Sequence, residues 1–232
     1  MSPRRLAACT TTETGRRPTV VVPLGSTEQH GPHLPLDTDT VVAQAVAEAL
    51  TDLLDVEEPC GALLAPAVAY GSSGEHQSFA GTVSLGAEAL RHLLVELVRS
   101  LRTWAGRVVL VNGHGGNLQA LTGAVEQLRH EGHDVRWAPC AVVGADAHAG
   151  RTETSLMLHL RPASVRLDRV EPGNATPVRQ LMPMLEAGGV ELVSRNGVLG
   201  DPRGASAEEG ASLLREMTAL ARTRAGAAAV PA

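Results

Sequence analysis

Residues 25–40 contain several side chains that could bind a metal ion. The acidic and imidazole residues of this stretch are Glu28, His30, His33, Asp37 and Asp39, and no arginine lies among them. Carboxylates and imidazoles that crowd together repel one another or lose solvation unless a positive charge lies between them. Nitrogen and oxygen ligands of this kind suit a divalent cation. The stretch therefore predicts a metal site.

Members of this stretch also have simpler interpretations. Glu28 and His30 would project to the same side of an extended segment, as two ligands of one site require, but such pairs are also common in solvated loops. Asp37 and Asp39 could cap the helix that follows them, because aspartate is favoured at that position. His33 is expected to be a loop residue.

A second candidate lies in the turn Asn112-Gly-His114-Gly-Gly-Asn117. Glycines let the backbone approach a ligand closely and the N-terminus of a following helix favours anions, so a phosphate loop is the competing interpretation. The turn has neither the length nor the lysine of a P-loop, and its glycines lack the dinucleotide-binding spacing. His114 is therefore predicted to bind a metal.

A third segment, residues 146–155, adds His148 and Glu153, with Gly150 allowing a bend between them. Glu153 could simply complement the positive end of the helix that begins there. We favour a metal-binding role for it, because the other two segments supply an incomplete site that needs another carboxylate. An imidazole such as that of His148 has a pKa near neutral, so it could carry a proton in catalysis.

Short β-rich runs alternate along the chain with helical patterns, which is typical of an α/β fold. Strands are expected at 19–22, 63–69, 107–111 and 135–143, and helices at 40–54, 87–104, 118–130, 153–160 and 207–222. Each candidate segment follows a strand. Open parallel sheets bind ligands beyond the carboxyl ends of their strands, so we expect the three segments to meet at one edge.

The composition excludes several classes of protein. All 20 basic residues are arginine, so a Schiff-base lysine, a P-loop lysine and a lysine base are impossible. A formal net charge of -5 gives no reason to expect binding to nucleic acid or to an anionic membrane. The three cysteines are far apart, which argues against a disulfide framework. The apolar run near the N-terminus is too short for a signal peptide, so a cytoplasmic location is expected.

Taken together, these segments resemble the signature blocks of the creatininase family of metal-dependent amidohydrolases. The matching residues are Pro23-Leu-Gly-Ser-Thr-Glu28-Gln-His30-Gly-Pro-His-Leu-Pro with Thr38-Asp39, then Asn112-Gly-His114-Gly-Gly-Asn117, then His148-Ala-Gly-x-x-Glu153-Thr-Ser155. A fourth, loop-forming block is Tyr70-Gly-Ser-Ser-Gly-Glu75-His76 with Phe79-Ala-Gly81-Thr82. Within the family, the whole chain is most similar to the peptidases of the mycofactocin system.

The resemblance implies a single-domain, three-layer αβα sandwich with a mostly parallel central sheet at residues 18–223, between tails at 1–17 and 224–232. It also implies two divalent metal ions per chain, with Glu28 and His114 at one, His30 at the other and Asp39 bridging them. Creatininase has a glutamate where this chain has Gly116, and Glu153 is the residue we expect to supply the missing carboxylate. These donors suit zinc, iron or manganese.

The expected reaction is hydrolysis of an amide by a hydroxide shared between the two metals, with His148 passing a proton to the departing amine and Glu153 as ligand or base. The resemblance implies that the substrate is a modified precursor peptide, cut before its C-terminal Val-Tyr to release the core that matures into mycofactocin. A small cyclic amide or formamide is the alternative, and a non-catalytic metal-binding protein is the third hypothesis. A homo-oligomer is expected, as in other family members.

Overall fold

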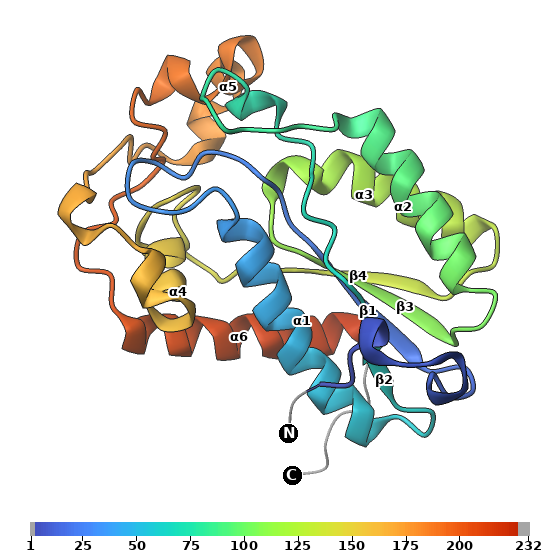
Figure 1. Ribbon diagram of the computed structural model, residues 1–232. Helices are drawn as coiled ribbons and strands as arrows, with labels where there is room; N and C mark the ends of the chain where they lie inside the picture. The colour runs from blue at the N-terminus through green and yellow to red at the C-terminus, as the bar shows by residue number, and fades with distance from the viewer. Residues whose placement is uncertain (1–2, 227–232) are drawn as a thin grey trace.

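The centre of the molecule is a four-stranded sheet in which neighbouring strands run parallel. The computed structural model describes residues 3–226 (Figure 1). Its strands are β1 (Thr19–Leu24), β2 (Ala62–Leu64), β3 (Arg107–Asn112) and β4 (Val135–Pro139), in the order β2-β1-β3-β4. The two central strands, β1 and β3, are therefore those that lead into the first two candidate segments.

The strand β1 runs two residues beyond the expected end at Val22. Pro23 has no N–H to donate, but its carbonyl accepts a hydrogen bond from Val68 N at 2.9 Å, and Leu24 O accepts one from Gly113 N at 2.8 Å. One missing donor does not end a strand that is paired on both sides. The pairing of Leu24 with Asn112 carries β1 and β3 to the same edge of the sheet.

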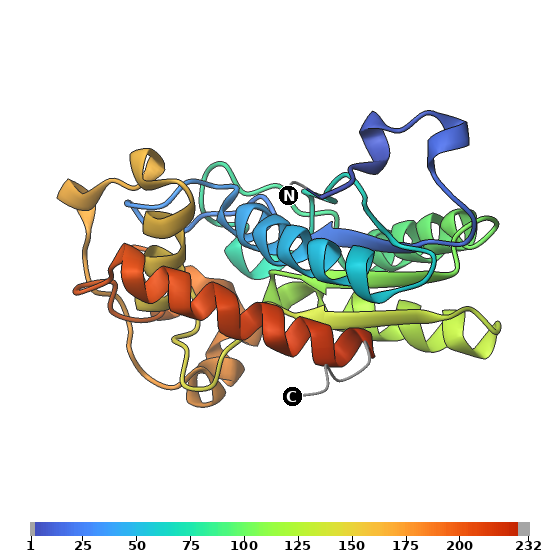
Figure 2. The same ribbon diagram turned by 90° about the horizontal axis from the view of Figure 1, so that it is seen from below.

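Helices cover both faces of the sheet, as the expected three-layer sandwich requires (Figures 1 and 2). On one face, Val20, Val22 and Leu24 of β1 pack with α2 (Ala87–Leu101) and α3 (Leu118–His130). On the other, Val21 packs with α1 (Thr38–Glu57), α4 (Arg151–Leu160) and α6 (Ala207–Ala225). This alternation follows from the period of two along a strand, and it confirms the predicted fold class.

One helix was not expected from the sequence. The helix α5 (Val178–Val193) lies between the helices expected at 153–160 and 207–222, where no element was expected. It contains Pro183, and Gly189 at φ 72° marks a kink between two helical parts. Proline and glycine are the residues that disfavour a helix most strongly, so the local sequence does not predict one.

Several element boundaries also differ from expectation. The strand expected at 63–69 ends at Leu64, the strand expected at 135–143 ends at Pro139, and the helix expected to reach Trp104 ends at Leu101. Short 3-10 helices occupy Leu6–Ala8, Thr11–Glu13, Gly74–His76, Gly115–Asn117, Pro162–Ser164 and Leu167–Arg169. Within the expected N-terminal tail, Leu64 N donates to Arg4 O at 2.8 Å. No helix in residues 3–226 has the length and apolarity needed to span a membrane.

Candidate metal centre

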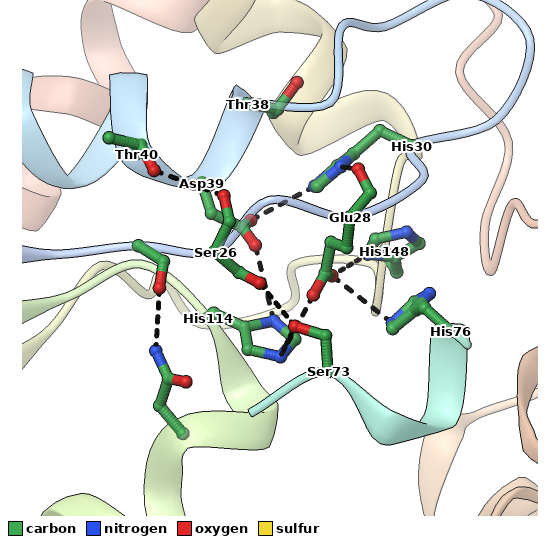
Figure 3. Close-up of polar contacts among 12 residues, drawn as sticks. Ser26, Glu28, His30, Thr38, Asp39, Thr40, Ser73, His76, His114 and His148 are labelled. Atoms are coloured by element: carbon green, nitrogen blue, oxygen red, sulfur yellow. Dashed lines mark hydrogen bonds and ion pairs between the residues drawn. The ribbon is translucent and has the colours of Figure 1, made fainter. Parts of the chain in front are cut away.

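The six predicted site residues meet at the carboxyl edge of the sheet. They are Glu28 and His30 in the loop after β1, Asp39 in the first turn of α1, His114 directly after β3, His148 before α4 and Glu153 in the first turn of α4. Figure 3 shows five of them pointing toward one another, from three parts of the chain. The expected convergence of distant segments is therefore present.

The distances between their donor atoms suit the coordination of a cation. His114 Nε2 lies 3.1 Å from Glu28 Oε2, and His114 Nδ1 lies 3.3 Å from Asp39 Oδ2. His30 Nε2 lies 3.1 Å from Asp39 Oδ1 and 3.8 Å from Glu153 Oε2. Three triads could hold a metal ion: Glu28, Asp39 and His114; His30, Asp39 and Glu153; and Glu28, His30 and His148. Asp39 is shared by the first two triads.

Unsatisfied carboxylate oxygens test whether a cation fits this cluster. Both oxygens of Glu28 and Oδ2 of Asp39 are buried and accept no hydrogen bond from any residue in the described range. A buried carboxylate oxygen without a hydrogen bond is disfavoured, so such atoms are normally hydrogen-bonded or bound to a metal. The donor set, with oxygen and imidazole ligands from the chain, is one that divalent cations favour.

A backbone contact orients one of the imidazoles for coordination. His30 is fully buried, and its Nδ1 donates to the carbonyl of Glu28 at 3.0 Å. When the ring is neutral, its lone pair is then on Nε2, which is the nitrogen that faces Asp39 and Glu153. Metal-binding histidines commonly donate their other ring N–H in this way, which fixes the ring and its tautomer.

The electrostatics of the cluster favour a positive charge within it. Burial by itself lowers the pKa of His30, but Asp39, Glu153 and Glu28 outweigh it and raise the pKa to about 10. Burial also opposes the protonation of His114, and there Glu28 and Asp39 raise the pKa to about 10. Burial raises the pKa of Glu153 to about 7, with Asp39 adding to the rise and His30 opposing it.

His148 differs from the other two imidazoles. Its Nε2 donates to the carbonyl of Gln29 at 2.8 Å, so the lone pair is on Nδ1, which lies 3.7 Å from Glu28 Oε1. Burial, followed by the neighbouring His30 and His76, holds the pKa of His148 well below its usual range. His148 is therefore neutral at neutral pH with its lone pair on Nδ1, and its pKa lies below the near-neutral value expected from the sequence.

Sequence reasoning missed two residues that touch this cluster. His76, in the 3-10 helix Gly74–His76, has its Nε2 3.3 Å from Glu28 Oε1. Gln29 donates from Nε2 to His76 Nδ1 at 2.8 Å and to Gly197 O at 3.1 Å. The block at residues 70–76 was noted in the sequence, but nothing in its spacing predicts contact with Glu28.

Two other members of the first stretch lie apart from the cluster. Asp37 precedes α1 but makes no side-chain capping bond, and it pairs with Arg161 at 3.0 Å on the surface. His33 is buried, and its Nε2 contacts Thr154 Oγ1 at 2.9 Å. Only part of the dense acidic and imidazole stretch therefore contributes to the cluster.

A cavity of about 920 Å³ opens onto this cluster. Asp39, His114, His148 and Glu153 line it on one side. Apolar side chains line it elsewhere, among them Leu118 of α3, Val178, Met182 and Leu185 of α5, and Met217 of α6. The candidate metal centre is thus accessible to a molecule that binds in the cavity.

Comparison with known proteins identifies the family. The family model for creatininase, described as creatinine amidohydrolase, matches residues 7–223. The chain belongs to the creatininase family. It is 58% identical over 203 residues to the mycofactocin precursor peptide peptidase of Mycobacterium ulcerans (strain Agy99), covering 86% of this chain and 81% of the relative. It is 31% identical to the creatinine amidohydrolase of Pseudomonas putida, with 84% of each chain covered.

Solved structures of the family agree with the observed fold. A structure described as creatininase Mn superposes with a TM-score of 0.76 and 27% identity, covering 95% of this chain and 97% of that chain. A mutant creatininase described as Zn-Zn type gives a TM-score of 0.75 and 27% identity, covering 94% of this chain and 95% of that chain. The predictions of a creatininase-like fold and of a metal-dependent amide hydrolase are therefore confirmed at the level of the family.

Proposed function

We propose that this creatininase-family protein is a metal-dependent peptidase that cuts a modified mycofactocin precursor peptide before its C-terminal Val-Tyr, releasing the small core for cofactor maturation. The buried oxygens of Glu28 and Asp39, which face imidazoles but accept no hydrogen bond within the described range, lie beside an open cavity and carry the proposal of a metal hydrolase. The peptidase relative at 58% identity supports the choice of substrate.

Two divalent cations fit the donor set. Glu28, Asp39 and His114 would hold one, and His30, Asp39 and Glu153 would hold the other, with Asp39 shared. The ligand types suit zinc, iron or manganese. When bound, such a pair lowers the pKa of a water toward neutrality and polarises a carbonyl group.

The residues of the chain supply the proton transfers. His148 is neutral, and its Nδ1 faces the cluster because its Nε2 is committed to the carbonyl of Gln29. This orientation places it to take a proton from the attacking water, and its lowered pKa then favours giving that proton to the departing amine. Glu153, whose pKa burial raises to about 7, is a second group that could exchange a proton in this range.

The cavity suits a peptide with a modified, uncharged end. Its volume of about 920 Å³ lies near the upper end of the usual range for small-molecule sites, which is about 300 to 1,000 Å³. Among the described residues that line it are several carboxylates but no arginine, so it offers no guanidinium group to pair with a C-terminal carboxylate. The wall from α5 offers apolar contacts instead. A decarboxylated Val-Tyr end would fit both properties.

Mass spectrometry of the modified precursor peptide tests this function. The peptide is incubated with metal-loaded protein, with chelator-treated protein and with the Glu28→Gln variant. We expect release of the C-terminal core by the metal-loaded wild type alone. An intact peptide despite bound metal would refute the peptidase and favour the small cyclic amide or formamide. Size-exclusion chromatography and cell fractionation would test the expected homo-oligomer and cytoplasmic location.

A further inference from the structure

The carboxylate of Glu75 reaches the metal cluster through space that Gly116 leaves open. Glu75 Oε1 lies 3.6 Å from His114 Nε2, the same nitrogen that lies 3.1 Å from Glu28 Oε2. A Cβ atom at position 116 would lie 2.4 Å from Glu75 Oε1 and 2.4 Å from His114 Nε2. A side chain at position 116 would overlap these atoms, so the observed position of the Glu75 carboxylate requires glycine at 116.

The segment that carries Glu75 is held from two sides. On the cluster side, the neighbouring His76 lies 3.3 Å from Glu28 Oε1 and accepts a hydrogen bond from Gln29. On the other side, Gly189 of α5 has φ 72°, and a Cβ atom there would lie 2.5 Å from the backbone oxygen of Glu75. Only glycine allows this approach. Glu75 is therefore positioned by its surroundings at the edge of the cavity, which it also lines.

Glu75 adds a carboxylate on the side of the cluster opposite to Glu153. Glu153 lies beside His30, 3.8 Å from its Nε2, whereas Glu75 lies 3.6 Å from His114 Nε2. A negative charge at that position attracts a cation held by Glu28, Asp39 and His114.

We propose that Glu75 is a further member of the metal centre, strengthening the binding of the cation at Glu28, Asp39 and His114 from the space left by Gly116. This inference rests on the proposed function, because it requires the metal centre. Residues that support metal ligands typically change the affinity for the metal by about 10- to 100-fold when they are replaced. Glu75→Gln keeps the shape of the side chain and removes its charge, so it isolates this contribution.

Titration with Mn²⁺ alone tests the proposal without any substrate. Chelator-treated wild type, Glu75→Gln, Glu75→Asp and Glu28→Gln are titrated by calorimetry, with Glu186→Gln as the matched control. Glu186 also lines the cavity but comes from α5. We expect Glu75→Gln to weaken one of two binding events by about 10- to 100-fold and to leave the other unchanged. Glu75→Asp should give an intermediate loss, since it keeps the charge on a shorter side chain.

The outcomes separate this inference from the proposed function. If Glu28→Gln loses a cation while Glu75→Gln binds both with wild-type affinity, the role of Glu75 is wrong and the proposed centre stands. If wild type binds no cation, both are wrong. Thermal unfolding of the metal-free variants detects simple misfolding: the proposal requires that Glu75→Gln melts like wild type without metal and gains less stability when Mn²⁺ is added.

Discussion

A cluster of ionisable side chains lies near each end of the strand β3, and the acids of the two clusters have different partners. At its start, Arg107 lies 2.9 Å from Glu58 and 3.0 Å from Asp134, so the acids are paired with a permanent cation of the chain. Beyond its end, Glu28 and Asp39 face only imidazoles, and several of their oxygens have no hydrogen bond within the described range. The first cluster is complete in itself, whereas the second is arranged to receive a cation.

Replacing a carboxylate of the second cluster should have the largest effect. Glu28→Gln removes a charge without changing the shape of the side chain, so we expect loss of one cation per chain and a fall in peptide hydrolysis to the level of chelator-treated protein. Metal content by plasma mass spectrometry and turnover by chromatography measure the two losses. Glu88→Gln, on the first turn of α2, is the control. Full metal content in Glu28→Gln would remove Glu28 from the proposed ligands.

Replacing His148 should separate turnover from metal binding. His148→Ala removes the proposed proton carrier, so turnover should fall by about 10²- to 10⁴-fold while the metal content stays that of wild type. The exposed His92→Ala serves as the control. A variant that loses metal instead would show that His148 is a ligand, as the triad with Glu28 and His30 allows.

The pH dependence of metal binding tests the charge state of the imidazoles in the second cluster. In the metal-free protein the pKa values of His30 and His114 are about 10, so both imidazoles carry a proton at neutral pH. A cation must displace these protons, and its affinity should therefore rise with pH, by about tenfold per pH unit for each proton released. Calorimetry in buffers of different ionisation enthalpy counts the protons. An affinity that does not change between pH 6 and 8 would contradict the charge state we assign to the imidazoles.

Breaking the first cluster should have the smallest effect and should leave the metal untouched. Arg107→Met leaves Glu58 and Asp134 without their partner, and we expect the free energy of unfolding to fall by about 1 to 3 kcal/mol. Chemical denaturation measures it, with Arg203→Met, from an exposed pair, as the control that should change by less than about 0.5 kcal/mol. A loss of bound metal in Arg107→Met would show that the two ends of β3 are not independent.

The sequence predicted the chemistry of the site better than the outline of the fold. Glu28, His30 and Asp39 were recognisable because several ionisable side chains are crowded together, and His114 because a histidine in a glycine turn after a strand has few structural uses. Whether each of these residues binds metal stays a prediction. The apolar patterns located β3 and α3 closely, since β3 is a continuous apolar run buried on both faces and α3 buries one regular face.

Other features of the structure depend on contacts between segments that are distant in the sequence, and a local sequence pattern does not predict such contacts. The helix α5 forms despite Pro183 and Gly189, and Gly189 is needed there because the backbone of Glu75 lies against it. The roles of Gln29 and His76 arise from segments 47 residues apart that meet only in the folded chain. Tertiary packing of this kind overrides local preference, so no comparison of neighbours along the sequence would reveal it.

The apolar wall that α5 gives to the cavity and the candidate metal ligands come from different parts of the chain. The triads that could hold a metal lie in the segments after β1 and β3 and around the start of α4, and among the described residues none of their members lies in α5. Apart from Gly189, which lies against the backbone of Glu75, positions in α5 can therefore change without touching the candidate metal ligands. In evolutionary terms, the same hydrolytic machinery could be inherited intact by descendants that act on new substrates, with α5 as the segment that diverges first.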